Sequence, residues 1–113
     1  MRPLQHPPIR SVTVPGILHA LADPVRLGIV QALADEEEGV SCVDMMHRTR
    51  TRLPKSTCSQ HYQILREAGL ITSERKGVEL VSRLRRKELN RRFPGLIDTI
   101  LAAHQPTPKR RTA

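Results

Sequence analysis

Aromatic residues are nearly absent from this chain, which has 113 residues, no tryptophan, one tyrosine and one phenylalanine. With only Tyr62 and Phe93 to use, a hydrophobic core must be aliphatic, which suits a small helical fold better than a β-sandwich. Modules that bind structured RNA need exposed aromatic side chains for base stacking, so the same scarcity disfavours that function.

Cysteines and long apolar stretches are also scarce. Cys42 and Cys58 are the two cysteines, too few for a disulfide framework. No N-terminal apolar run could serve as a signal peptide, and no stretch approaches the roughly 20 residues that a membrane span requires. We therefore expect a cytoplasmic protein with reduced thiols and no membrane partner.

Positive charge, in contrast, is in excess: the formal net charge is +8 and the isoelectric point is near 10.7. A small domain this basic often has a polyanionic partner, and nucleic acid is the first candidate. The alternative is charge that serves only solubility. Hydrophobic residues make up 38% and charged residues 27% of the chain, which is typical of a soluble globular protein.

The composition divides the chain into three segments. Residues 1–11 contain three prolines without periodicity and are predicted to form a flexible N-terminal arm. Residues 104–113 are predicted to form a basic, disordered tail. The folded domain is expected between them, over residues 12–103, and its length suits one domain with one modest core.

The first half of this domain carries clear helix signals. A short helix is predicted over residues 14–22. Asp23 is expected as the N-cap and Pro24 as the first residue of a second helix, which ends before Gly39. The residues expected to be buried are Ile17, Leu18 and Leu21 in the first helix, and Leu27, Val30 and Ala34, flanked by Ile29 and Leu33, in the second.

Two more helices follow. Ser41, with Asp44 three residues later, resembles a capping box that opens a helix through His47. After a basic turn, Pro54 precedes a longer helix that Gly69 ends. These two helices, joined by a turn, are expected to form a helix-turn-helix.

The pattern then changes from helix to hairpin and back. The β-branched stretch over residues 70–84, with a glycine near its middle, predicts a β-hairpin. A last helical pattern over residues 89–101 is interrupted by Pro94, so we expect a kink, or a short helix followed by a longer one. The predicted fold is mainly α with a small β-hairpin, which is a winged helix-turn-helix.

The predicted helix from Lys55 to Ala68 has an unusual polar face. Cys58, Tyr62 and Leu65 recur at helical spacing and should face inward, with Ile64 beside them. The opposite face carries side chains that donate and accept hydrogen bonds, which can read base edges when a helix lies in the major groove of DNA. The residues assigned to base readout are Ser56, Thr57, Ser59, Gln60, His61 and Gln63. For His61, a partly buried structural imidazole is the alternative.

Basic residues flank this helix where a DNA backbone would run. They lie in the turn before the helix, at its N-terminus, where the helix dipole also favours a phosphate, and at the hairpin tip. The residues assigned to phosphate contacts are Arg48, Arg50, Arg52, Lys55, Arg75 and Lys76.

Two stretches resemble the arsenic-repressor (ArsR) family of bacterial winged helix-turn-helix regulators. The family pattern Asp-Pro-x-Arg-x-x-Ile matches Asp23, Pro24, Arg26 and Ile29. Its recognition-helix pattern matches in part, with the corresponding residues Ser56, Ser59, His61, Leu65, Ala68, Gly69 and Leu70. The likeness covers roughly residues 12–103.

The resemblance implies a homodimer, joined through its first and last helices, that binds a palindromic DNA operator, usually as a repressor. The apolar stripe from Leu89 to Leu101 supports dimerisation because it contains too many apolar side chains to remain exposed to solvent on a small monomer. Alternatively, it packs only within its own chain. The residues assigned to dimerisation are Ile17, Leu18, Leu21, Phe93, Leu96, Ile97, Ile100 and Leu101.

The metal-sensing motifs of the family are not matched. Where some members have Cys-x-Cys at the start of the third helix, this chain has only Cys42, and its last helical region offers Glu88, Asp98 and His104. Zinc needs a convergent, tetrahedral set of ligands. We therefore predict no metal and no cofactor, and the lack of a catalytic motif predicts no enzymatic activity.

Two alternative functions stay open. The first is a redox-responsive regulator of the same fold, in which oxidation of Cys42 or Cys58 changes DNA binding. The second is a winged-helix adaptor that docks another protein through the apolar stripe and the acidic run Asp35–Glu38.

Overall fold

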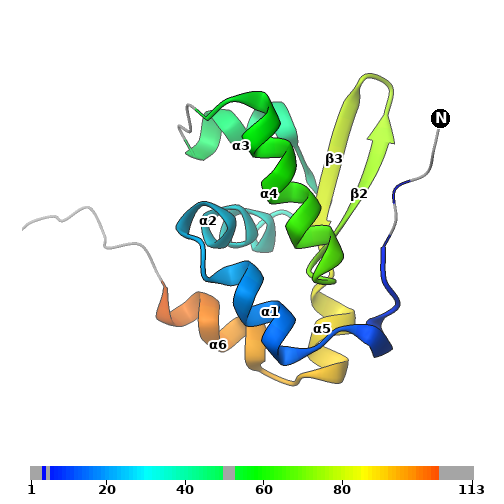
Figure 1. Cartoon of the computed structure of the whole chain (residues 1–113), viewed down its shortest axis with the longest axis vertical. Helices are drawn as coiled ribbons and strands as arrows, with labels where there is room; N and C mark the ends of the chain where they lie inside the picture. Colours follow the sequence, from blue (N-terminus) through cyan, green and yellow to red (C-terminus); the bar gives the residue numbers. More distant parts are fainter. Residues whose placement is uncertain (1–3, 5, 50–52, 105–113) are drawn as a thin grey trace, which may run out of the picture.

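The computed structural model describes residues 4, 6–49 and 53–104. In these residues a hairpin projects from a helical body (Figure 1), which confirms the predicted fold class. The helices are α1 (Val14–Leu21), α2 (Pro24–Ala34), α3 (Cys42–Thr49), α4 (Lys55–Glu67), α5 (Arg86–Arg92) and α6 (Leu96–Ala103). The strands are β1 (Val40–Ser41), β2 (Ile71–Lys76) and β3 (Glu79–Leu84), and a 3-10 turn, η1, spans Ile9–Ser11.

Local capping interactions explain where the helices begin and end. The Asp23 carboxylate accepts hydrogen bonds from the backbone N–H groups of Val25 and Arg26, at 2.7 and 3.3 Å. The Ser41 hydroxyl accepts one from the N–H of Asp44 at 3.1 Å. After α4, Gly69 adopts a φ of +84°, a conformation that favours glycine. The predicted helix boundaries at these positions are confirmed.

The sheet has the strand order β1-β3-β2 and is antiparallel throughout. β2 and β3 form the predicted hairpin, closed by Gly77 and Val78 between the paired residues Lys76 and Glu79. The two-residue strand β1 was not predicted, because a segment this short shows no periodicity and depends on pairing with β3, about 40 residues later. β2 is left as an edge strand.

The core is aliphatic, as predicted, and Tyr62 is the one aromatic residue in it. The prediction that Leu18 is buried is wrong, since it is 50% exposed. Ile17, Ala20 and Leu21 occupy the inward face of α1, and Leu18 points roughly 100° away from Ile17. In α2 the buried face is shifted: Ile29, Val30 and Leu33 are buried, whereas Leu27 and Ala34 are half-buried.

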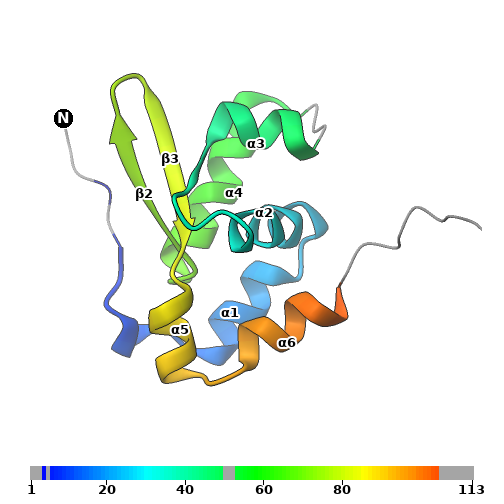
Figure 2. The same cartoon turned by 180° about the vertical axis from the view of Figure 1, so that it is seen from behind.

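The last helical pattern forms two short helices, α5 and the slightly longer α6, which confirms the second of the two predicted alternatives. Pro94 lies in the break, and Gly95, with a φ of +78°, is the N-cap of α6. Helices α1, α5 and α6 lie together at the end of the molecule away from the hairpin tip (Figures 1 and 2). Among the described residues, no single helix is long and apolar enough to cross a membrane. The pair α1 and α2 together has the necessary length and apolarity, but the two helices are bent by 104° relative to each other.

The described part of the predicted N-terminal arm lies against the domain. The backbone N–H of Ser73 in β2 donates to Nε2 of His6 at 3.0 Å, and Arg85 donates to the carbonyl oxygen of Pro7 at 2.8 Å. Arg92 donates to the carbonyl oxygen of Ile9 at 3.0 Å. These contacts show where His6–Ser11 lie in the structure, and the flexibility expected for residues 1–11 stays a prediction. The predicted tail, apart from His104, is outside the described residues.

Candidate nucleic-acid interface

Helix α4 has one buried face and one exposed face, as its sequence predicts. Tyr62 and Leu65 are 4% and 0% exposed, and Cys58 and Ile64 are half-buried. Of the residues assigned to base readout, the exposed ones are Ser56, Ser59, Gln60 and Gln63, and the half-buried ones are Thr57 and His61. The exposed amide and hydroxyl groups form a polar strip along α4 that can meet base edges.

His61 is joined to the interior by Arg26, a buried residue of α2. Its Nδ1 lies 3.3 Å from Nη1 of Arg26. The same guanidinium donates to the carbonyl oxygens of Ala20, at 2.7 Å, and His19, at 3.3 Å. This network connects α1, α2 and α4 and therefore favours the structural alternative for His61. The motif Asp23-Pro24-x-Arg26 contained a signal for it, since an arginine within an apolar helix needs acceptors.

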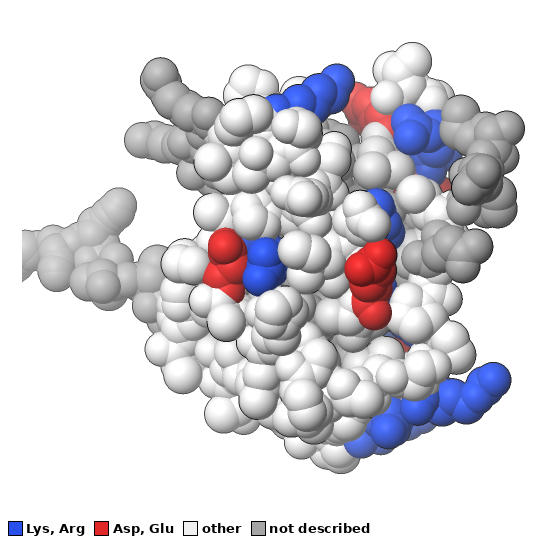
Figure 3. Space-filling view, viewed as in Figure 1, with Lys and Arg blue, Asp and Glu red and all other residues white. Residues whose placement is uncertain are grey.

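The predicted phosphate contacts are placed unevenly. Lys55, Arg75 and Lys76 are exposed, and Arg48 forms an ion pair with Glu36 at 3.2 Å. Arg50 and Arg52 lie outside the described residues. Figure 3 shows Lys and Arg side chains near the top of this face, near the wing (the hairpin of β2 and β3) and at the lower right. The surface between them is mostly uncharged, with one acidic group and one pair of opposite charges. The Lys and Arg side chains therefore lie around the polar strip of α4 and do not cover it.

The residues assigned to dimerisation fall into two groups. Ile17, Leu21, Ile97 and Leu101 are between 0% and 6% exposed, so they belong to the core of the single chain. Leu18 is half exposed, and Phe93, Leu96 and Ile100 are half-buried and pack against that core. Sequence reasoning missed Val14, which is 38% exposed one turn before Leu18. These two side chains give α1 an apolar surface.

No group of three or more His, Cys, Asp or Glu residues in the described part of the chain could hold a metal ion. Cys42 and Cys58 are free thiols. Burial raises the pKa of the Cys42 thiol, although its interaction with the Tyr62 hydroxyl acts in the opposite direction. Cys42 is therefore held mainly as the less reactive thiol form.

The helix-turn-helix formed by α3 and α4, followed by a β-hairpin, defines a winged helix-turn-helix protein. A family model described as "Helix-turn-helix domain" matches residues 21–74. The chain is 42% identical over 69 residues to the HTH-type transcriptional repressor SmtB of Mycobacterium tuberculosis. The matched residues make up 60% of this chain and 47% of SmtB. The chain therefore spans about half the length of that relative.

Two further relatives extend the likeness over most of the chain. The HTH-type transcriptional regulator YceK of Bacillus subtilis is 30% identical over 84 residues, covering 74% of this chain and 82% of YceK. The solved structure of an ArsR-like transcriptional regulator from Rhodococcus sp. RHA1 superposes with a TM-score of 0.53 at 25% identity, covering 79% and 86% of the two chains. The chain belongs to the ArsR family of winged helix-turn-helix transcriptional regulators.

Proposed function

We propose that this protein is a sequence-specific DNA-binding repressor that acts as a homodimer. The observation that carries the proposal is the strip of exposed Ser and Gln side chains on α4, a helix fixed to the core by Tyr62 and Leu65. A rigid helix with an exposed hydrogen-bonding face is the element that reads base edges in the major groove. This role is not enzymatic, and it places the protein with DNA in the cytoplasm.

The surrounding cations supply the sequence-independent part of binding. Three exposed cations lie near the polar strip of α4. They are Lys55, in the first turn of α4, and Arg75 and Lys76, at the end of β2. Each can contact a phosphate of the strand that borders the groove, which fixes the register of α4 without reading sequence. Arg50 and Arg52 are proposed to act in the same way from the turn before α4.

Dimerisation would use the exposed apolar surface of α1 together with α6. Val14 and Leu18 are one turn apart on α1, and the half-buried Leu96 and Ile100 contribute from α6. A palindromic operator requires two copies of α4 about one helical turn of DNA apart, roughly 34 Å, and the proposed dimer has to meet this spacing. The relative SmtB, which is named as a repressor, supports the direction of regulation.

The first experiment is fluorescence anisotropy with the duplex upstream of the protein's own gene, a scrambled duplex and a series of salt concentrations. We expect a preference of about 10³-fold or more for the native duplex. Equal affinity for both duplexes with a steep salt dependence would contradict specific readout by α4 at this site. No binding at low salt would support the protein-adaptor alternative.

One observation supports testing the redox-responsive alternative as well. Cys42 and Cys58 line the same cavity, next to the recognition helix. If oxidation regulates the protein, mild peroxide should change its mass and abolish DNA binding, and Cys58→Ser should abolish that response. The raised pKa of Cys42 argues against a fast reaction at this thiol.

A further inference from the structure

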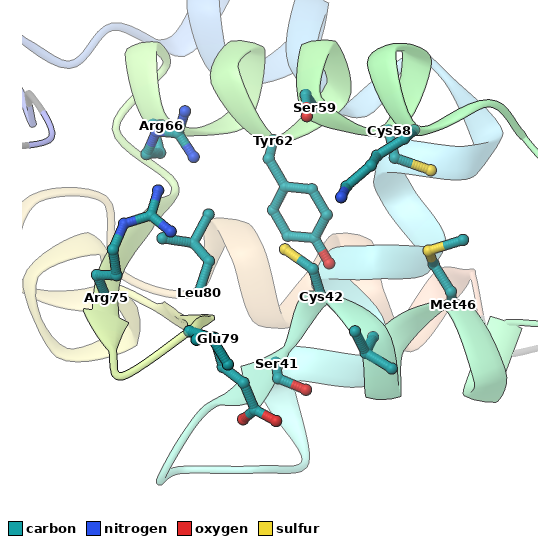
Figure 4. A pocket seen from close by; sticks show the side chains of 13 residues that line it. Ser41, Cys42, Met46, Cys58, Ser59, Tyr62, Arg66, Arg75, Glu79 and Leu80 are labelled. Carbon is teal, nitrogen blue, oxygen red and sulfur yellow. The ribbon is translucent and has the colours of Figure 1, made fainter.

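A cavity of about 420 Å³ lies between α3, α4 and the wing. Its size is within the range of small-molecule sites. Val43 and Met46 of α3, the ring of Tyr62, and Leu80 of β3 give it apolar walls. Figure 4 shows these elements enclosing the cavity, with the sulfur atoms of Cys42, Cys58 and Met46 away from the arginine end.

The other end of the cavity is cationic. The guanidinium groups of Arg66 and Arg75 point toward one another there (Figure 4). Arg66 is half-buried, and its one hydrogen bond within the described residues is a long one, 3.4 Å, to the Ser73 hydroxyl. Among those residues it forms no salt bridge, and burial lowers its pKa. Two cations that line the same end of the cavity, one of them partly desolvated, favour an anion at that end.

The side chain of Tyr62 also lines the cavity. Tyr62 is 4% exposed, and its hydroxyl makes no hydrogen bond to nitrogen or oxygen among the described residues. The hydroxyl lies toward the thiol of Cys42 (Figure 4), which is a weak partner. The hydroxyl is itself closed to solvent, so the ring of Tyr62, and not its oxygen, forms part of the cavity wall. The one carboxylate at the cavity, that of Glu79, is directed away from the two arginines (Figure 4).

We propose that this cavity binds a small organic anion as an effector. Its acidic group sits between Arg66 and Arg75, and its apolar body extends along the Tyr62 ring toward Met46. The ligand class is therefore an amphipathic carboxylate, sulfonate or phosphate of small size.

Occupancy of the cavity weakens DNA binding, a consequence that rests on the proposed function. Lys55, Ser59 and Arg75 line the cavity and are also assigned to DNA contacts. An anion held by Arg75 neutralises a charge that would otherwise meet a phosphate. It also fixes the wing relative to α4, because Arg66 and Arg75 belong to these two elements.

The binding test uses the full chain and a built-in probe. Tyr62 is the only tyrosine and there is no tryptophan, so the intrinsic fluorescence of the protein comes mainly from a side chain that lines this cavity. Sodium octanoate and 1-octanol are titrated as a matched anion and neutral molecule. We expect a saturable change with octanoate and affinity at least about tenfold weaker for octanol, since hydrogen bonds to a charged group are strong. No saturable change, or equal affinities, would overturn the proposal.

Two variants distinguish octanoate binding in the cavity from attraction of octanoate by the net charge of the protein. Arg66→Gln should weaken octanoate binding about tenfold or more. Arg91→Gln removes the same charge from an exposed position on α5 and should leave it unchanged. Equal weakening by both variants would mean that the net charge, and not the cavity, attracts the anion, and would overturn the site.

The effect on DNA is then measured separately. Octanoate should release wild-type protein from its operator at the concentrations that change Tyr62 fluorescence, and Arg66→Gln should require about tenfold more. If the wild type binds octanoate but no DNA, the proposed function fails and the cavity assignment stands. If it binds DNA but octanoate leaves the complex intact while saturating the fluorescence change, the effector role fails.

Discussion

The Nδ1 atom of His61 on α4 lies 3.3 Å from Nη1 of Arg26 on α2. Arg26 is 8% exposed and also holds the carbonyl oxygens that end α1. The recognition helix, which Tyr62 and Leu65 pack against the core, is thus also connected to α1 and α2 through the side chain of Arg26.

The Arg26→Ala variant tests this connection. We expect its free energy of unfolding to fall by about 2–3 kcal/mol, because the carbonyl of Ala20 loses its donor and the buried side chain leaves a void. Urea denaturation gives the value, and Arg91→Ala, exposed on α5, should change it by less than about 0.5 kcal/mol. Equal stability of both variants would contradict a structural role for Arg26.

Gln60→Ala tests base readout by α4. Gln60 is exposed, and a bidentate contact to an adenine would contribute about 1–3 kcal/mol of discrimination. We expect weaker binding to the operator and little change on a scrambled duplex, measured by anisotropy. Thr99→Ala, exposed on α6, is the control. Equal weakening on both duplexes would show that Gln60 contacts the backbone instead.

Arg75→Ala tests the wing. Losing one phosphate contact should weaken binding to every duplex and reduce the slope of log K against log salt by roughly one unit. The salt series described above measures this slope. An unchanged slope would remove Arg75 from the phosphate contacts, while a loss confined to the operator would assign it to base or groove readout.

Leu18→Asp tests the dimer surface. Leu18 is 50% exposed on α1, so aspartate is tolerated in a folded monomer but disfavoured in an apolar interface. We expect light scattering to report a monomer at concentrations where the wild type is dimeric. Val43→Asp, at a 58% exposed position on α3, should remain dimeric. A Leu18→Asp variant that is still dimeric would contradict the proposal that the surface of α1 forms the dimer interface.

The contact between His6 and Ser73 is expected to depend on pH. Burial, followed by the nearby charges of Arg66 and Arg85, lowers the pKa of His6 from its ordinary 6.5. Because the folded pKa is below the unfolded one, the contact's contribution to stability is complete above about pH 6.5 and declines as the pH falls through the folded pKa. Protonated Nε2 also cannot accept the Ser73 N–H.

Amide hydrogen exchange of Ser73 measures this effect. Its protection should fall below pH 6.5 relative to neighbouring amides of the hairpin. His6→Ala should show low protection at every pH. Protection in the wild type that does not vary with pH would mean that the ring is not required to cover the edge of β2.

Local signals determined most of the secondary structure. Asp23, Ser41 and Gly69 could be interpreted from the sequence because a cap or a positive φ involves residues only a few positions apart. The period of apolar residues in the same way identified the two faces of α4. The order of helices and hairpin predicted the winged helix-turn-helix, and the excess of positive charge predicted a nucleic-acid partner. The family resemblance added the homodimer and the palindromic operator.

Only the tertiary structure decided how these elements meet. The strand β1, the contact of Arg26 with His61, and the docking of His6 on β2 join residues far apart in the sequence. The cavity between α3, α4 and the wing exists because three elements pack at particular angles. A sequence pattern records which face of an element is apolar. Which partner covers that face, and what space remains between them, depends on packing of the whole chain.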